Sequence, residues 1–420
     1  MKSPVISAAI LALLAAVAAK PALAAGCDIT VGMVMPLTGP AGAYGQAGAK
    51  AVDMAFRDFN EAGGVHGCHL TTDARDSESQ GTVAVDQATQ LVDIKKVPVI
   101  IGGIISSESI PILTSVTAPA GVVQVSPASS SPTLTQLCQQ GKTNGVFFRT
   151  ITSDALQGTA AAKFAIDSGL KKIAIIDVNN DFGVNMVKEF TSAYKKLGGT
   201  ITSITPYNPN QASYSAEASS AMAGDPDALY LVSYPVDGAT IARAWISGGG
   251  PQKFLLNDGM NSPDFISAVG AKYLNDAYGT SSGTDETAST QYFYSNFAAF
   301  SGGIKPEAPA ADRSYDAGAI VALAIAKAGK GDAAAIKAAI PEVVAPGGTP
   351  IYAGKAEFTK ALGLLAAGKP IRYEGVIGAI SFDHCGDITG PFRLWRIQAG
   401  DVKTVGQMSA EDVMKIKAGS

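Results

Sequence analysis

Apolar runs of strand length alternate with segments of helical periodicity along most of this 420-residue chain. In the first part we expect strands, each followed by a helix, at residues 29–35 and 44–62, 69–73 and 81–93, 97–105 and 110–118, and 121–125 and 133–139. Such alternation is typical of parallel sheets that are covered by helices on both faces. In these folds, ligands bind at the carboxyl ends of the strands. The sequence therefore predicts an α/β protein.

A second alternating series begins after residue 150. We expect helices at 155–168, 185–196, 213–223 and 238–247, and strands at 172–177, 200–205, 228–233 and 253–257. Because 420 residues exceed the usual size of a single core, two doubly wound domains are expected. After residue 283 the alternation weakens, with helices expected at 310–328 and 333–340 and β-like runs at 378–383 and 392–398. This tail is too short for a third domain, so it should contribute to both units.

Two expected strands of the first series end abruptly at small hydroxyl residues, in segments 101–109 and 126–132. We expect a serine to cap the helix that follows each strand. Backbone N–H groups and the positive end of each helix dipole would then face the carboxyl end of the sheet, which suits a small carboxylate ligand. Ordinary helix capping would leave the same pattern, so a ligand site has to be supported by the rest of the chain.

Charge and histidine content argue against several function classes. A formal net charge of −4 leaves no basic surface for a nucleic acid. The three histidines do not form a Ser/His/Asp set, and no phosphate-binding or dinucleotide-binding motif is present. We therefore expect neither an enzyme nor a cofactor.

Residues 1–24 have the organisation of a signal peptide. Lys2 is followed by an apolar segment and then by Ala22-Leu23-Ala24, a small-x-small site that predicts cleavage near Ala24/Ala25. No later stretch approaches the ~18 uninterrupted apolar residues of a membrane span. The mature chain is expected to be exported to the periplasm and soluble.

Four cysteines suit an oxidising compartment and allow three disulfide pairings. Cys27 and Cys68 open the first two expected strands, which are neighbours in a doubly wound sheet, so Cys27–Cys68 is the preferred bridge. Cys138 and Cys385 then remain for the second bridge.

Two alternatives concern the same cysteines. Residues 24–27 loosely resemble a lipobox, in which case Cys27 would be acylated rather than bridged. His66-Gly67-Cys68-His69 invites a metal-binding interpretation, but no second ligand cluster accompanies it. We therefore expect a turn leading into a disulfide-linked strand there, and no metal.

Several segments, in this order and spacing, are characteristic of one family. They are residues 39–45 (GPAGAYG), 59–67 (FNEAGGVHG), 101–109 (IGGIISSES), 126–135 (SPASSSPTLT), 181–183 (DFG) and 382–390 (FDHCGDITG). With these motifs the chain resembles the type I periplasmic solute-binding proteins of ABC transporters, specifically the leucine/isoleucine/valine-binding and amide-binding group. The resemblance covers nearly all of the chain after the signal peptide.

The resemblance implies two lobes that are joined by three crossover strands and close around the ligand. The crossovers map near Thr150, Thr280 and Phe382. Lobe one would then comprise residues 25–150 plus 281–382, lobe two residues 151–280 plus 383–408, and residues 409–420 would form a C-terminal tail.

The family's ligand contacts on lobe one also carry over by position. Ser106 matches the serine that holds the ligand carboxylate through its hydroxyl and amide, and Ala128 matches a residue whose carbonyl accepts from the ligand ammonium. Ser130 stands where a threonine contacts the α-amino-acid group, and the adjacent Ser129 is a further candidate. Tyr44 stands where an aromatic ring packs against the ligand side chain.

On the opposite side of the cleft, Tyr234 matches an aromatic wall and Asp258 matches an acidic partner of the ammonium. Phe182 stands where a tyrosine is frequent and lacks its hydroxyl, and Asp258 is one methylene shorter than the common glutamate. Tyr315 is a further aromatic candidate. Packing between lobes would also account for the aromatic residues, and a turn would account for Asp258.

The resemblance implies the extracytoplasmic binding component of an ABC importer, acting as a monomer with a transporter permease as partner. The expected ligand is a small carboxylate, foremost an apolar, branched-chain-like amino acid. The Ser106 and Ser130 corners are expected to hold the ligand carboxylate without a lysine or arginine. The alternative is a sensory protein for amides or for aromatic or aliphatic acids.

Overall fold

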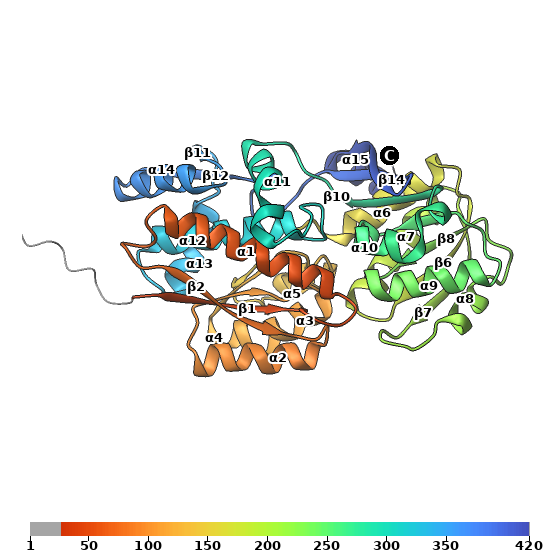
Figure 1. Ribbon diagram of the computed structural model, residues 1–420, viewed down its shortest axis with the longest axis horizontal. Helices are drawn as coiled ribbons and strands as arrows, with labels where there is room; N and C mark the ends of the chain where they lie inside the picture. The colour runs from red at the N-terminus through yellow and green to blue at the C-terminus, as the bar shows by residue number, and fades with distance from the viewer. Residues whose placement is uncertain (1–26, 420) are drawn as a thin grey trace, which may run out of the picture.

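A computed structural model describes residues 27–419 and shows two α/β lobes lying side by side along the long axis (Figure 1). The first lobe is built on a five-stranded parallel sheet of order β2-β1-β3-β4-β5. Its strands are β1 (Ile29–Met35), β2 (Leu70–Asp76), β3 (Val99–Gly102), β4 (Val123–Ser126) and β5 (Phe147–Arg149). The short strands β3 and β4 are buried along their whole length, as expected for central strands covered on both faces.

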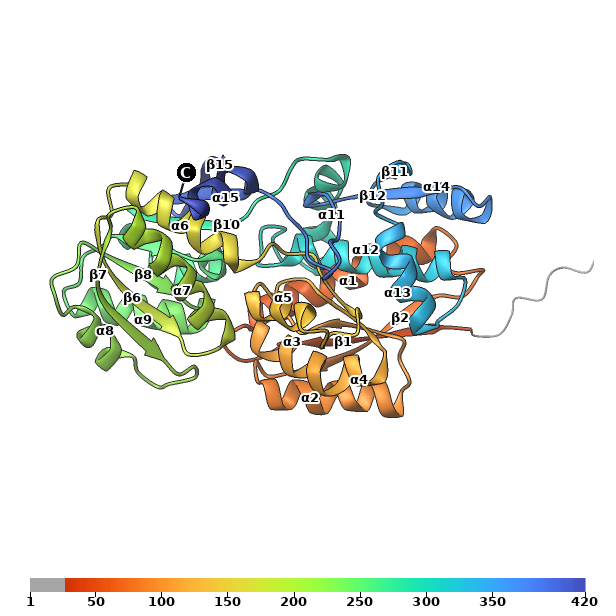
Figure 2. The same cartoon turned by 180° about the vertical axis from the view of Figure 1, so that it is seen from behind.

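Helices cover both faces of this sheet. One face carries α1 (Gly42–Glu61), α12 (Ala311–Ala328) and α13 (Ala333–Glu342). The other carries α2 (Gly81–Thr89), η1 (Gln90–Ile94), α3 (Ser106–Ile112), η2 (Leu113–Thr117), α4 (Ala118–Ala120) and α5 (Pro132–Gln139), most of which are visible in Figure 2. Small residues bring α1 and α12 close together, since a Cβ on Gly48 would lie 2.9 Å from Ser314 Oγ. Helix α12, which returns from the far end of the sequence, is thereby built into the core of the first lobe.

The second lobe contains a seven-stranded sheet of order β15-β14-β10-β9-β8-β6-β7. Its parallel part consists of β6 (Lys172–Val178), β7 (Thr200–Tyr207), β8 (Ala228–Val232), β9 (Phe254–Leu256) and β10 (Ala277–Ser282). Two antiparallel strands from the end of the chain, β14 (Phe392–Gln398) and β15 (Asp401–Met408), complete it. Its helical elements are α6 (Asp154–Asp167), α7 (Asp181–Lys196), α8 (Ser215–Ala221), α9 (Pro235–Ser247), η3 (Asp258–Met260), α10 (Pro263–Val269), η4 (Ala271–Tyr273) and α15 (Ala410–Ala418).

A small third sheet extends the first lobe beside α1. It contains β11 (Thr349–Ile351), β12 (Ile371–Gly375) and β13 (Gly378–Ala379), flanked by α11 (Ala288–Ser301) and α14 (Lys355–Ala366). Asp316 on α12 fixes this sheet, because its carboxylate accepts hydrogen bonds from Tyr373 Oη and from the N–H groups of Val376 and Ile377.

The chain passes between the lobes three times, after β5, after β10 and between β13 and β14. The crossing segments lie side by side: Thr152 forms a bridge with Ile388, and the Thr152 and Ser282 hydroxyls share a hydrogen bond. Three adjacent, short connections of this kind allow one lobe to rotate relative to the other.

Both preferred disulfides are confirmed, Cys27–Cys68 beside β1 and β2 and Cys138–Cys385 between α5 and the third crossing segment. A bridged Cys27 has no thiol left for acylation. The predicted signal peptide lies outside the described residues. Within residues 27–419, no helix combines the length and apolar character that a membrane span requires.

Candidate ligand-binding site

A cavity of about 270 Å³ lies between the lobes and brings together seven of the nine residues that the sequence analysis proposed as ligand contacts. They are Tyr44, Ser106, Ala128 and Ser130 from the first lobe and Phe182, Tyr234 and Asp258 from the second. Ile104 and Ile105 complete the lining. We call this space the primary cavity.

Ser106 is the first residue of α3, so this helix begins earlier than the expected residue 110. The expectation of a serine cap was wrong here, because the N-cap is Ile105 and its side chain makes no capping hydrogen bond. The Ser106 hydroxyl instead accepts from the Ser131 N–H at 3.1 Å. Its own hydrogen is left to donate into the primary cavity, beside the free N–H groups that begin the helix.

The second corner has the expected cap, since Ser131 precedes α5 and its hydroxyl accepts from the Thr133 N–H at 3.2 Å. The neighbouring Ser130 donates to Asp154 Oδ2 at 2.9 Å, while Asp154 Oδ1 has no partner within residues 27–419. Burial, and then the nearby charge of Asp258, raise the pKa of Asp154 well above its usual range. The sequence analysis did not name Asp154, because this residue precedes the helix expected at 155–168 and belongs to none of the family motifs.

Aromatic rings form the wall on the second lobe. Phe182, in the first turn of α7, stacks with Tyr234 at a centroid distance of 5.8 Å. Tyr44 of α1 meets Tyr234 edge to face at 6.4 Å. Asn180 Nδ2 donates to Tyr234 Oη at 3.2 Å and fixes the orientation of that ring. The three rings leave the primary cavity with an apolar side that suits a hydrocarbon group.

Asp258 adds a carboxylate to this wall. Its Oδ1 accepts from Asn257 Nδ2 and from the Gly259 N–H, both at 3.1 Å. Burial raises the pKa of Asp258, although its hydrogen bonds and the charge of Arg313 oppose the shift. An acidic group in this setting favours a cationic partner, and a ligand ammonium would supply one.

The lobes also touch directly at the cleft. Asn185 Nδ2 on α7 donates to Ser131 Oγ and to Thr133 Oγ1, both at 3.3 Å. Together with the Tyr44–Tyr234 contact, this bridge shows that the cleft is closed in this structure.

Two proposed contacts lie elsewhere. Ser129 is fully buried, with its hydroxyl 2.6 Å from Ser109 Oγ, and does not line the primary cavity. Tyr315 lies within α12, where it donates to Asp58 Oδ2 at 2.8 Å and accepts from the Gly354 N–H at 3.1 Å. Both residues support the core of the first lobe.

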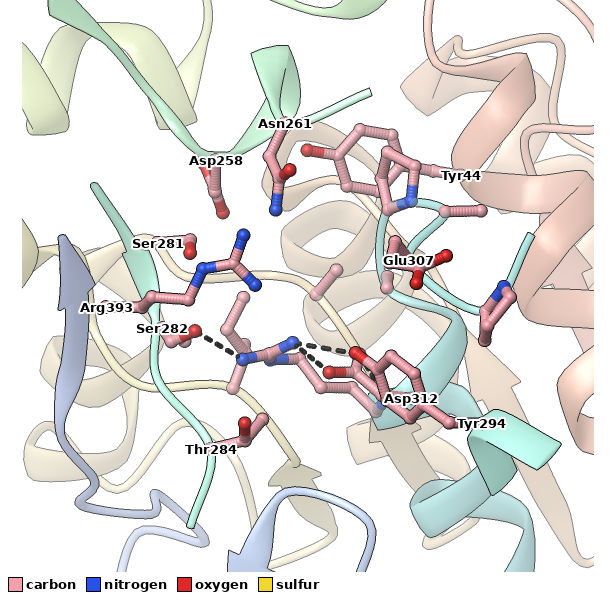
Figure 3. A pocket seen from close by; sticks show the side chains of 17 residues that line it. Tyr44, Asp258, Asn261, Ser281, Ser282, Thr284, Tyr294, Glu307, Asp312 and Arg393 are labelled. Atoms are coloured by element: carbon pink, nitrogen blue, oxygen red, sulfur yellow. Dashed lines mark hydrogen bonds and ion pairs between the residues drawn. The ribbon is translucent and has the colours of Figure 1, made fainter. Parts of the chain in front are cut away.

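A second cavity of about 630 Å³ adjoins the first and shares Tyr44, Ala128 and Asp258 with it (Figure 3). We call it the distal cavity. It is lined by Arg313 and Arg393, which the sequence analysis did not name. These residues follow the second and third crossings, and no sequence spacing linked them to the serine corners.

One group of potential metal ligands, Cys138, His384 and Cys385, occurs within residues 27–419. The two sulfurs form the Cys138–Cys385 disulfide, so neither is available as a thiolate.

Fold and cleft together define a two-lobed binding protein of periplasmic type. A family model described as periplasmic binding protein matches residues 28–382, and the chain belongs to this family, which consists of solute-binding proteins. The Leu/Ile/Val-binding protein BraC3 of Rhizobium johnstonii is 26% identical over 90% of this chain and 94% of its own. A chemotactic signal transduction substrate-binding protein, BasB of Halobacterium salinarum, is 25% identical over 85% and 84%. The leucine-binding protein LivK of Thermotoga maritima has the same fold, with a TM-score of 0.76 and 24% identity over 91% of this chain and 99% of its own.

Proposed function

We propose that this protein captures a small α-amino acid in the periplasm and delivers it, by closure of its lobes, to the permease of an ABC importer. The observation that carries the proposal is the division of the primary cavity between the lobes. Serine hydroxyls and helix N–H groups lie on one side, and aromatic rings with an acidic group lie on the other. The relationship to BraC3, which is named for leucine, isoleucine and valine, supports an amino acid as ligand.

Each part of an amino acid has a complementary group in this proposal. Ser106, with the amides that open α3, would hold the α-carboxylate, because a helix N-terminus favours negative charge. The ammonium would lie between the Ala128 carbonyl and Asp258. The rings of Tyr44, Phe182 and Tyr234 would cover the hydrocarbon part of the side chain, so an apolar ligand remains our first expectation for the primary cavity alone.

Transport follows from closure, because a ligand that touches both lobes stabilises the closed form through contacts that the open form lacks. We assign residues 25–150 and 281–382 to lobe one and residues 151–280 and 383–408 to lobe two, with 409–420 as a C-terminal segment whose helix α15 packs on lobe two. A monomer is sufficient for this cycle, since one chain supplies both walls of the cleft.

Isothermal titration calorimetry with L-leucine, L-isoleucine, L-glutamate and benzoate tests the proposed ligand class. Small-angle scattering at ligand saturation tests the mechanism, and we expect a smaller radius of gyration with ligand. Identical scattering curves at proven saturation would exclude the hinge mechanism, and binding of benzoate alone would exclude an amino-acid carrier.

The similarity to BasB favours one second candidate, a receptor-coupled sensor that uses the same closure. Capture of the permease by the ligand-loaded protein, without capture of a chemoreceptor, would favour transport over sensing.

A further inference from the structure

The distal cavity contains polar groups that the proposed α-amino-acid contacts do not use. Arg393 lies on β14 opposite Ser281 of β10, and Phe392 beside it is buried against Ala160 and Val413. Because neighbouring side chains of a strand point to opposite faces, Arg393 is directed away from that apolar cluster and toward the cleft. Figure 3 shows its guanidinium in the cavity beside Ser281 and Asn261.

In the described part of the chain, these three side chains have no hydrogen-bond or ion-pair partner. Within residues 27–419, the guanidinium of Arg393 makes no hydrogen bond or ion pair, and neither the Asn261 amide nor the Ser281 hydroxyl is hydrogen-bonded. All three can donate hydrogen bonds, and one carries a full positive charge. Partly buried arginines are normally paired, because their desolvation is otherwise uncompensated.

The acidic residues near Arg393 do not form an ion pair with it. Asp312 is occupied by Arg313, whose Nη1 lies 2.8 and 2.9 Å from its two carboxylate oxygens. Arg313 Nη2 also donates to the Ser282 carbonyl at 2.9 Å. Glu307 is exposed at the rim of the cavity, and Asp258 uses Oδ1 for Asn257 and Gly259. Among residues 27–419, Arg393 therefore has no carboxylate in direct contact, although the more distant charges of Asp312 and Glu307 favour its charged form.

The distal cavity lies next to the primary cavity. Tyr44, Ala128 and Asp258 line both, so a ligand whose α-amino-acid group occupies the primary cavity would extend its side chain past Tyr44 toward Arg393. Along this path the protein presents serine hydroxyls and helix amides, then Asp258, then Arg393. The complementary ligand is anionic at one end, cationic next to it and anionic again at the other end.

We propose that the distal cavity binds a second carboxylate of the ligand, through Arg393, Asn261 and Ser281. This inference rests on the proposed function and narrows its ligand class from α-amino acids to short amino dicarboxylic acids, whose ammonium would meet Asp258. The hydrocarbon stem of such a ligand lies against Tyr44. A guanidinium, an amide and a hydroxyl around one carboxylate form charge-assisted hydrogen bonds, which are about twice as strong as neutral ones.

Pairs of ligands that differ in charge and little in shape provide the test. Calorimetry on the wild-type protein compares L-aspartate with L-asparagine, L-glutamate with L-glutamine, and L-2-aminoadipate with L-norleucine. Glutarate and adipate report on dicarboxylates that lack the ammonium. We expect at least one acid to bind tenfold or more tightly than its neutral counterpart. The length of the acid that binds most tightly should then indicate the distance that a ligand has to span between Ser106 and Arg393.

Arg393→Gln should abolish this preference for the acid, and Arg393→Lys should restore part of it. The matched control is Arg396→Gln on the same strand, because Arg396 lies outside both cavities and contacts Asp276 and the Tyr278 ring. Ser281→Ala, a smaller change, should reduce affinity for the acid several-fold without altering the melting temperature.

Different results would contradict the distal subsite and the proposed function. Tighter binding of L-leucine than of every acid, unchanged in Arg393→Gln, would overturn the distal subsite and leave amino-acid capture intact. An acid preference that survives Arg393→Gln would also overturn it. If wild-type protein that melts cooperatively bound neither the acids nor L-leucine and L-isoleucine, the proposed function would be overturned together with the subsite.

Discussion

Arg149 Nε lies 2.6 Å from Asp387 Oδ1 and joins the end of β5 to the third crossing segment. The same guanidinium donates from Nη1 to the carbonyls of Ser129 and Ser131, at 3.0 and 3.1 Å. One fully buried side chain thus fixes both the serine corner and a strand of the hinge region. The floor of the cleft on lobe one and this crossing segment are held as one unit.

Arg149→Met should destabilise the protein strongly, because it removes the guanidinium that donates to Asp387 Oδ1 and to the carbonyls of Ser129 and Ser131. Removing one partner of a buried pair typically costs about 3–5 kcal/mol. Urea unfolding should show this loss, whereas Arg396→Gln at the partly exposed pair with Asp276 should change stability by less than about 1 kcal/mol. Equal stability of Arg149→Met and wild type would mean that the pair is dispensable.

Ser106→Ala should weaken ligand binding by about tenfold or more. The variant removes a hydroxyl that faces the proposed carboxylate, and such a bond is worth roughly 1–3 kcal/mol in a dry cleft. Ser107→Ala on the same helix is the matched control, because Ser107 lines neither cavity. Calorimetric affinity equal to wild type would remove Ser106 from the site.

Asp258→Asn should discriminate between amino acids and plain carboxylates. An ionised Asp258 attracts a ligand ammonium, so the variant should lose affinity for an amino acid and little for its deaminated analogue. Because the pKa of Asp258 is raised, lowering the pH should protonate it sooner than an ordinary aspartate and weaken amino-acid binding in wild type. Equal losses for both ligands, or none, would indicate that Asp258 only shapes the turn.

Glu108 should make stability fall as the pH rises. It is fully buried on α3, receives a hydrogen bond from Ser77 Oγ, and has a pKa raised from 4.5 to about 7 by burial. The folded state therefore holds this proton more tightly than the unfolded state, which favours folding below pH 4.5 and is progressively lost up to about pH 7. That shift corresponds to about 3 kcal/mol.

Glu108→Gln should remove the contribution of Glu108 to the pH dependence of the free energy of unfolding. Unfolding measured at pH 5 and pH 8.5 should show a smaller difference for the variant than for wild type, with the variant more stable at the higher pH. Parallel stability profiles for the two proteins would contradict the assignment.

Both disulfides should be present in protein isolated from the periplasm. They join residues 41 and 247 positions apart, and removal of either should lower the free energy of unfolding by about 2–5 kcal/mol. Peptide mapping without reduction checks the pairing. A lipid adduct on Cys27 in that map would contradict the Cys27–Cys68 bridge.

Strands with continuous apolar runs could be predicted from the sequence, because burial on both faces requires that composition. The pattern of residues alone did not indicate β10, although the family resemblance mapped a crossover strand near Thr280. Its Tyr-Gly-Thr-Ser-Ser segment is polar, yet Thr280, Ser281 and Ser282 are buried near the crossings. β15 was missed for the opposite reason, since it is a largely exposed edge strand with no apolar face to recognise.

The primary cavity was predictable where family motifs fixed positions, as for Ser106, Tyr234 and Asp258. The distal cavity was not, because Arg393 reaches it only through the pairing of β14 with β10, more than a hundred residues earlier. Ser129 and Tyr315 were predicted as ligand contacts but do not line the primary cavity. Sequence proximity to a site does not decide whether a side chain faces the ligand or the core, and here both face the core.

The Asn185 amide that spans the cleft has a kinetic consequence. Its bonds to Ser131 and Thr133 involve protein groups alone, so they favour the closed arrangement whether or not the cleft is filled. A closed form that is populated before binding must open to admit solute, and a loaded one must break the same bonds to discharge it. We therefore expect Asn185, which lines neither cavity, to slow both the entry and the release of the ligand.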